Sequence, residues 1–379
     1  MTGRAQTKGE WEGGQGAANP GRAVQEVLDA AVRAGRTPGA VFLTGRPGLA
    51  TEAAVAGQAQ VLGGPARPMH RGTLFDLASL TKVTATLPAV LLLAERGDLA
   101  LDDEVRRFLP GFTGGRRDEI TVRQLLAHTS GLPAEIKFWQ LYRDPGEAAR
   151  AMLGTRLEHA PGSTVVYSDI GFMLLGQLVG AVAGAPLDAV VAELVTGPLR
   201  MTRTGFRPGT GPDAEQAAAT ELQPGGTALC GIVHDENARF FGGVAGHAGL
   251  FAPADDLARY LQLGWLDGQL LSPAMRAEAC RLQTAGAGGR RGLGWVLRGD
   301  AQDALGTRWP ATSATHTGFT GTSLAFDPAS GGWAVLLTND VHFGRGRGLI
   351  RGLREAVHDR CAPPPGDYLP AVRRLPIAA

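Results

Sequence analysis

The feature that most constrains the fold is where the strand-prone segments lie along the chain. One helical pattern and two β-prone runs begin the sequence, and four β-prone runs and one helical pattern end it. In chain order these segments are 20–36, 39–44, 53–62, 293–297, 313–317, 323–327, 333–339 and 349–358. Short runs of this kind, separated by Gly and Pro, predict a hairpin at the start and a meander at the end. We therefore expect an α+β fold in which both ends of the chain build one antiparallel sheet with helices packed on it.

The middle of the chain, 101–282, has a different character. Its apolar residues recur at helical spacing, as in 170–182 and 254–266, which predicts an all-helical insertion. The predicted domains are a discontinuous sheet domain, 20–100 with 283–379, and a mainly helical domain, 101–282, with the active site between them. Residues 1–19 are polar and Gly-rich and lack the apolar core of a signal peptide, so we expect a disordered tail. A cytoplasmic location follows by default; a misassigned start would allow a periplasmic or extracellular one.

Composition excludes several classes of protein. A net charge of +1 argues against a nucleic-acid surface, and no apolar run approaches the length of a membrane span. Cys230, Cys280 and Cys361 are widely separated and predict neither a disulfide framework nor a zinc site. We expect no cofactor and no metal, and the sequence predicts no oligomeric state.

A serine and a lysine three residues apart, Ser79 and Lys82, precede an apolar run to Leu93. This run predicts a helix with Ser79 in its first turn and both side chains on one face. The chain contains 34 Arg but only three Lys and eight Ser, so about 0.06 such pairs are expected by chance. A hydroxyl beside an amine, near free backbone N–H groups, suits nucleophilic catalysis. The alternative is that Ser79 only caps the helix and that the Lys82 side chain extends into solvent.

Two further triplets carry chemistry. Tyr167-Ser168-Asp169 follows a Pro-Gly turn, and its phenol can act as a base where an ammonium group favours the phenolate. His316-Thr317-Gly318 ends a β-prone run, where a strand edge can offer an N–H to a substrate carbonyl. The alternative for Tyr167 is a half-buried side chain whose hydroxyl bonds to the backbone. The alternative for His316 is a polar residue at the end of a strand before a turn.

The segments 234–238 and 246–249 are also rich in polar groups and glycine. Neither has the spacing of a zinc motif, so a loop held by turns and caps is the favoured interpretation of His234, Asn237 and His247. The chain contains no Gly-x-Ser-x-Gly elbow, which argues against an α/β-hydrolase.

Taken in order, the three triplets resemble the motifs of the serine β-lactamase and penicillin-binding-protein superfamily, in its class C-like branch of β-lactamases, esterases and D,D-peptidases. Further segments are similar to that branch: 97–103, 125–132, 292–295 and 318–323. The resemblance extends over roughly 20–345. It implies the β-lactamase/transpeptidase-like fold, with an antiparallel sheet, flanking helices and a helical insertion.

The resemblance also implies roles. Ser79 would be the acylated nucleophile, Lys82 the adjacent base and Tyr167 its partner in proton transfer. The N–H groups of Ser79 and Phe319 would form the oxyanion hole, and Gly318 would admit the substrate. Either Lys82 or the Tyr167 phenolate could take the proton, and the sequence does not decide between them.

Two residues depart from the branch. Asp169 stands where Asn is usual, and His316 stands where Lys is common. Both would contact substrate, and both changes weaken the case for substrates that carry a carboxylate. We therefore expect a serine hydrolase that cleaves an ester or amide of a small molecule without a cofactor. The alternatives are a D,D-carboxypeptidase or D-aminopeptidase, a β-lactamase, and a non-catalytic binding protein.

Overall fold

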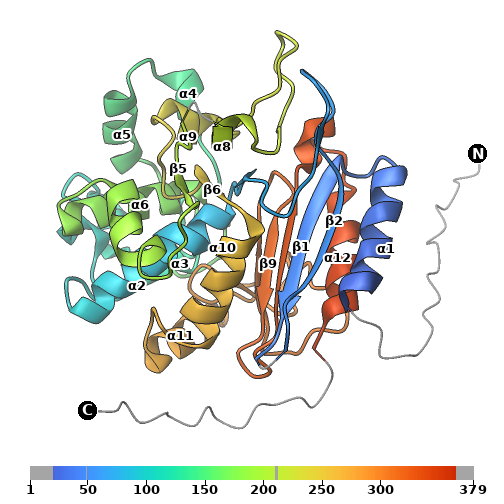
Figure 1. Ribbon diagram of the computed structural model, residues 1–379. Helices are drawn as coiled ribbons and strands as arrows, with labels where there is room; N and C mark the ends of the chain where they lie inside the picture. The colour runs from blue at the N-terminus through green and yellow to red at the C-terminus, as the bar shows by residue number, and fades with distance from the viewer. Residues whose placement is uncertain (1–19, 48, 210–211, 364–379) are drawn as a thin grey trace, which may run out of the picture.

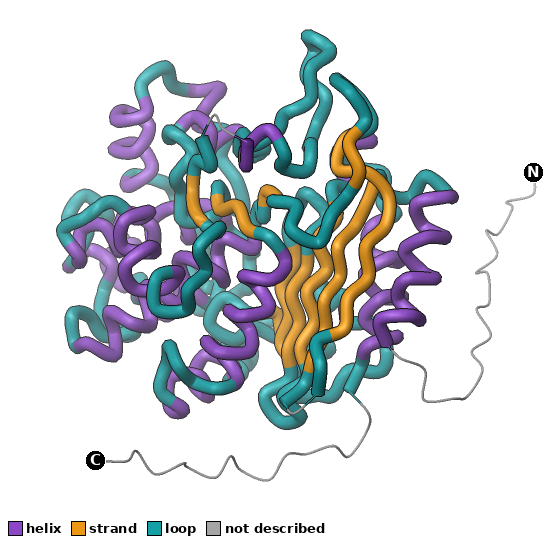
Figure 2. Tube along the Cα trace, in the orientation of Figure 1, coloured by secondary structure: helices purple, strands orange, loops and turns teal. Residues whose placement is uncertain are grey.

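The structure, a computed structural model, describes residues 20–47, 49–209 and 212–363. Its main feature is an antiparallel sheet (Figure 2), in which the strands from the start of the chain lie side by side and meet those from its end at one pair of strands. The strands in spatial order are β3 (Arg67–Pro68), β2 (Glu52–Gln60), β1 (Gly39–Gly45), β10 (Trp333–Thr338), β9 (Ser323–Phe326), β8 (Ala314–Thr317) and β7 (Val296–Leu297). The predicted α+β fold class is confirmed.

The pair β1 and β10 lies at the centre and joins the two ends of the chain. Ala40 pairs with Thr338 and Gly45 with Trp333, in antiparallel register. Every residue of both strands is buried, which explains why these runs are apolar almost without alternation. The hairpin between β1 and β2 and the meander from β8 to β10 are as predicted.

Helices α1 (Pro20–Arg33) and α12 (Ile350–Cys361) cover one face of the sheet and pack on each other (Figure 1). The apolar side chains that meet there are buried: Val24, Leu28, Phe42, Leu336, Leu353 and Val357. The two helices come from opposite ends of the chain, so this layer also depends on both ends.

The opposite face carries the larger core, where Val41, Leu43, Val335 and Leu337 join side chains of the helical part. Helix α10 (Ala254–Arg259) lies against β1 and β10, while α2 (Leu87–Arg96) packs on α6 (Asp169–Ala183). Thus α10 contacts the sheet although it falls within 101–282, and α2 contacts helices although it falls within 20–100. The predicted domain boundaries themselves stay a prediction.

The remaining helices are short and connect these layers. They are η1 (Lys82–Thr86), η2 (Val105–Arg107), η3 (Gly115–Glu119), α3 (Val122–Leu126), α4 (Phe138–Leu141), α5 (Pro145–Leu153), α7 (Leu187–Val191), η4 (Ala192–Thr196), α8 (Pro212–Glu215), α9 (Glu236–Phe240), η5 (Tyr260–Leu266), α11 (Pro273–Cys280) and η6 (Asp340–Phe343). Within the described ranges, no single helix is long and apolar enough to cross a membrane; the sharply bent α6 and α7–η4 pair meets the test by length and composition alone.

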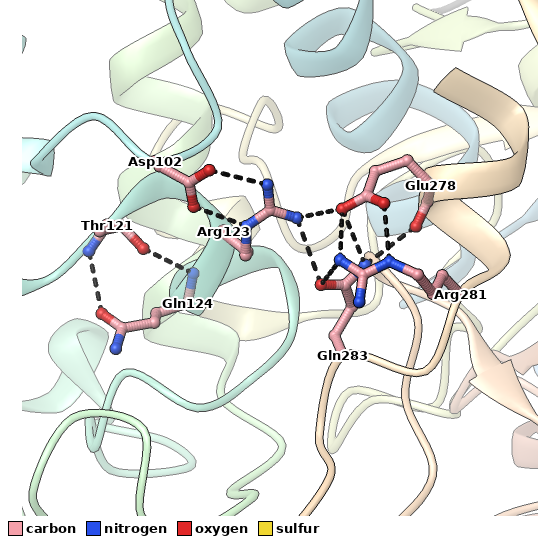
Figure 3. Close-up of polar contacts among 7 residues, drawn as sticks. All are labelled: Asp102, Thr121, Arg123, Gln124, Glu278, Arg281 and Gln283. Carbon is pink, nitrogen blue, oxygen red and sulfur yellow. Dashed lines mark hydrogen bonds and ion pairs between the residues drawn. The ribbon is translucent and has the colours of Figure 1, made fainter. Parts of the chain in front are cut away.

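Helix α3 illustrates how the short helices are fixed. Thr121 and Gln124 form a reciprocal capping box at its start (Figure 3). The Arg123 guanidinium then joins Asp102 to Glu278 on α11. Hydrogen bonds from Arg281, and then Arg123, outweigh burial and lower the pKa of Glu278 to about 2. This network ties α3 to α11, directly before the chain returns to the sheet.

A second, three-stranded sheet was not predicted. It contains β4 (Phe75–Asp76), β6 (Leu250–Ala252) and β5 (Gly205–Phe206) in the order β4-β6-β5. Strand β4 immediately precedes Ser79, and Leu77 continues its contact with β6 by donating its N–H to the Leu250 carbonyl. The small sheet therefore fixes the approach to the candidate nucleophile.

Candidate active site

Ser79 lies in a tight turn between β4 and the following helix, not in the first helical turn as predicted. Ala78 before it has a φ of 46°, a left-handed conformation that is costly for a residue with a side chain. The buried Asp76 carboxylate stabilises this turn: Oδ1 accepts the Ala78 N–H at 2.8 Å, and Oδ2 accepts the His234 N–H at 2.6 Å. Asp76 was missed in the sequence because its partners lie far apart along the chain.

Lys82 begins η1, a π-helical segment that leads directly into α2. Pro88 is the second residue of α2, directly after the π turn, where its missing N–H is tolerated. The Lys82 side chain is fully buried. Its Nζ lies 3.1 Å from Ser79 Oγ, 3.1 Å from the His247 carbonyl oxygen and 2.7 Å from Asp169 Oδ1.

Tyr167 and Asp169 reach Lys82 from the start of α6. Ser168 between them caps this helix, since its Oγ accepts the Gly171 N–H at 3.1 Å. Burial lowers the pKa of Lys82, but Asp169 and then Tyr167 outweigh this effect and raise the pKa to about 12. Burial raises the pKa of Tyr167 against the opposing charge of Lys82. At neutral pH Lys82 is therefore an ammonium group and Tyr167 a neutral phenol.

His316 at the end of β8 faces the same centre, with its ring centroid 5.9 Å from that of Tyr167. Its Nδ1 lies 3.0 Å from the Thr317 carbonyl oxygen, which can only accept, so Nδ1 carries the hydrogen. Burial, then Lys82 and Arg291, hold the pKa of His316 well below its usual value. The ring is neutral, and its buried Nε2 is an acceptor with no hydrogen-bond partner among the described residues.

The turn after His316 packs directly on the Ser79 turn. A Cβ on Gly318 would lie 2.4 Å from the Leu77 carbonyl oxygen, so only glycine fits there. Thr320 Oγ1 donates to the Asp76 carbonyl at 2.8 Å. The largely buried Arg354 of α12 donates to the carbonyls of Gly318 and Thr322 at 2.7 and 3.0 Å.

The backbone N–H groups of Ser79 and Phe319 are therefore held by fixed turns on the two sides of the cleft. Neither N–H has a hydrogen-bond acceptor within the described part of the chain. Free donors on rigid backbone are what an oxyanion hole requires. The Phe319 side chain is exposed and stacks on His234, with a ring centroid distance of 5.6 Å.

A cavity of about 450 Å³ opens onto these groups. Its lining includes Ser79, Tyr167, His316, Gly318, Phe319, Arg347, Arg351 and Arg354. The structure thus brings together all seven residues singled out in the sequence, with Lys82 and Asp169 directly behind Ser79. The sequence did not predict the three arginines, because they lie in and before the last helix without a motif of their own.

His128 is a further residue that the sequence did not assign. It adopts a left-handed φ of 59°, and its Nδ1 accepts the Ser168 N–H at 3.0 Å. Its ring lies 4.6 Å from that of Tyr167, and burial, then the charges of Arg291 and Lys82, lower its pKa well below the usual value. A neutral His128 therefore supports the turn that carries Tyr167. The 125–132 segment, already singled out, was the signal that could have identified it.

Comparison with known proteins places this geometry in context. Residues 24–358 match the family described as Beta-lactamase. The chain is 37% identical over 308 residues to an Escherichia coli (strain K12) protein named "Putative D-alanyl-D-alanine carboxypeptidase", covering 72% of this chain and 70% of that protein. It is 33% identical over 362 residues to the N-acetylmuramyl-L-alanine amidase of Bacillus subtilis (strain 168), covering 85% and 81%. The solved structure of EstCE1, a hydrolase with promiscuous acyltransferase activity, is similar with a TM-score of 0.71 and 28% identity, covering 89% and 98%.

Proposed function

Because the chain belongs to the beta-lactamase family, we propose that it is a serine hydrolase that cleaves an amide or ester through an acyl-enzyme on Ser79. The observation that carries this proposal is the contact of 3.1 Å between the buried Lys82 Nζ and Ser79 Oγ. A hydroxyl becomes a competent nucleophile when a neighbouring group can take its proton.

In the proposed acylation, the substrate carbonyl oxygen accepts the N–H groups of Ser79 and Phe319. Ser79 Oγ loses its proton to the Lys82–Tyr167 pair and bonds to the carbonyl carbon. The bond from that carbon to the leaving nitrogen or oxygen then breaks, and the leaving group takes up the proton. Water, deprotonated by the same pair, then attacks the carbonyl carbon of the ester on Ser79. The bond from that carbon to Ser79 Oγ breaks, Oγ regains the proton from the pair, and the acid is released.

The protonation states of Lys82 and Tyr167 before substrate binds limit how this mechanism can begin. With the pKa of Lys82 raised to about 12 and the pKa of Tyr167 also raised, neither group is a free base at neutral pH. The proton must therefore leave the pair as substrate binds or as pH rises. Either group can be the final acceptor, so the choice between Lys82 and Tyr167 stays open.

The preferred substrate class is an amide of a peptide that carries a carboxylate. The two relatives named above act, by name, on D-alanyl-D-alanine and on N-acetylmuramyl-L-alanine. Arg347, Arg351 and Arg354 line the cleft and bring positive charge to it, whereas the neutral His316 supplies no cation. Their N–H groups already bind Asp340, Glu355 and backbone carbonyls, so they would favour a carboxylate through their charge and not by direct contact. An ester substrate is the second candidate and rests on the likeness to EstCE1.

A fluorophosphonate probe tests the nucleophile. We expect it to label the wild-type protein and Ser163→Ala, a matched change of an exposed serine, but not Ser79→Ala. Equal labelling of the wild type and Ser79→Ala, or labelling of neither, would refute the proposal and favour a non-catalytic binding protein.

Turnover experiments test the substrate class. A D-Ala-D-Ala peptide, N-acetylmuramyl-L-alanine, a p-nitrophenyl ester and nitrocefin should be compared side by side with the wild-type protein. We expect the highest kcat/KM for one of the two carboxylate-bearing amides. A preference for the ester would show that the arginines do not select the substrate.

A further inference from the structure

The two polar segments without a role in the proposed chemistry lie directly behind the nucleophile. His234 anchors the Asp76 carboxylate of the Ser79 turn through its N–H. His247 gives its backbone carbonyl to Lys82 Nζ, and the Gly246 carbonyl accepts the Thr86 hydroxyl at 2.6 Å. Both segments therefore touch the elements that carry Ser79 and Lys82.

Asp235 and His247 join these segments to each other. Asp235 Oδ1 lies 2.9 Å from His247 Nε2 and also accepts the Ala238 N–H at 2.7 Å, which caps α9. A carboxylate oxygen only accepts, so the His247 Nε2 carries a hydrogen. Burial raises the pKa of Asp235, but His247 and the Ala238 N–H outweigh it and hold the pKa well below its usual value. The carboxylate is ionised at neutral pH.

The backbone at this point is also fixed on its other side. A Cβ on Gly246 would lie 2.0 Å from the Phe172 carbonyl oxygen and 2.8 Å from the Gly176 nitrogen, so the chain crosses α6 in direct contact. Four residues after Gly246, the Leu250 N–H donates to the Thr81 hydroxyl at 3.1 Å. The His247 ring is almost fully buried and is held by Asp235. The His247 carbonyl is therefore held in one orientation, toward Lys82 Nζ.

The orientation of this carbonyl affects where the N–H groups and the lone pair of Lys82 Nζ point. A neutral amine has two N–H groups and one lone pair, and besides Ser79 the Lys82 Nζ has the His247 carbonyl, Asp169 Oδ1 and the Tyr167 hydroxyl around it. When the His247 carbonyl and Asp169 each receive an N–H, the lone pair is left for the hydroxyls of Ser79 and Tyr167. A carbonyl that turned away would free one N–H and let the amine rotate about its last bond.

We propose that Asp235 and His247 are positioning residues, whose hydrogen bond fixes the carbonyl that aims the Lys82 lone pair at Ser79. This inference rests on the proposed function and adds two residues that act on the nucleophile only through Lys82. It assigns a role to both polar segments that the motifs alone leave unexplained.

The test measures the maximal rate constant of Ser79 labelling and the apparent binding constant of the fluorophosphonate probe separately. Asp235→Ala removes the hydrogen bond, and we expect the maximal rate to fall about 10- to 100-fold while probe binding is unchanged. His247→Phe keeps a buried ring and should cause the same loss. The double variant should lose no more than either single variant, because both break one link.

Asp235→Asn separates positioning from folding. Its amide oxygen can still accept from Ala238 and His247, so it should restore most of the rate. Asp144→Ala is the matched control: Asp144 caps α5 in the same way but has no contact with Lys82, and its labelling rate should equal that of the wild type. Urea unfolding of each variant shows whether it is folded.

Two outcomes would overturn the inference: additive losses in the double variant, or a folded Asp235→Ala protein that is labelled at the wild-type rate. These outcomes differ from failure of the proposed function, in which the wild-type protein itself is not labelled at Ser79.

Discussion

Burial lowers the pKa of Lys82, and Asp169, 2.7 Å from its Nζ, does most to raise it. Because the folded-state pKa of Lys82, about 12, exceeds its ordinary value of 10.5, this interaction contributes stability fully below pH 10.5. The contribution is lost as pH rises through about 12. In catalysis the same interaction opposes release of the proton from Lys82. Asp169 therefore keeps Lys82 protonated, and a protonated Lys82 cannot accept the proton of Ser79.

Asp169→Asn should therefore move the alkaline rise in activity to lower pH. The amide oxygen keeps an acceptor for Lys82 but removes the charge, which should lower the pKa of Lys82 by about 1–3 units. Asp169 also raises the pKa of Tyr167, so the shift has the same sign whichever group is the base. The measurement is the second-order rate of probe labelling from pH 7 to 10.5, with Asp144→Asn as control. A profile that coincides with the wild type would contradict this account.

At the level of single residues, the sequence predicted the candidate catalytic residues but not the residues that fix their positions. Ser79 and Lys82 were identified by a local spacing and by the rarity of lysine. Asp76, His128 and His247 also contact residues 40 or more positions away, namely His234, Ser168 and Lys82, and no local pattern encodes such contacts. The placement of Ser79 within the helix was wrong because Ala78 adopts a left-handed φ before the first helical turn.

The periodicity of apolar residues in the sequence predicts the long helices and strands but not the shortest strands. Helices α1, α6 and α12 and strands β1, β2 and β10 lie within a few residues of their predicted bounds. Strands β4, β5 and β6 contain only two or three residues each, too few for any period to be visible. These short strands nevertheless fix the turn that presents Ser79.

Helix α12 supports the turn that carries the Phe319 N–H through Arg354. Its guanidinium holds the Gly318 and Thr322 carbonyls and so fixes the Phe319 N–H between them. Arg354→Met should keep the helix packed but loosen this turn, and we expect probe labelling of Ser79 to slow about 10-fold, less than the loss of an oxyanion donor itself.

Arg360→Met provides the matched control on the same helix, since Arg360 lies at the α1 side away from the cleft. Its labelling rate should remain that of the wild type. If both variants label equally fast, the turn around Phe319 is held without Arg354, and its buried charge must serve another purpose.

For the molecule as a whole, we expect the sheet and the active site to unfold together, although their apolar side chains form two clusters on opposite faces of the sheet. Phe42 is fully buried between β1 and the α1–α12 layer, far from Ser79 in sequence. Phe42→Ala should destabilise the protein by about 3–5 kcal/mol through lost burial and the cavity left behind.

We expect tryptophan fluorescence and Ser79 labelling of this variant to be lost together, at the same lowered urea concentration. Leu141→Ala, at an exposed position, should leave the midpoint unchanged. Labelling that survives after the fluorescence transition would mean that the helical part folds and supports the site independently of the sheet.

The pairing of β1 with β10 has a consequence for synthesis of the protein. Ala40 leaves the ribosome long before Thr338, its partner, by roughly 15–60 s at ordinary translation rates. During that interval the β1–β2 hairpin presents an unpaired apolar edge, which in a nascent chain invites aggregation or chaperone binding. Translation speed and chaperone supply, rather than the final stability, should therefore limit the yield of native protein.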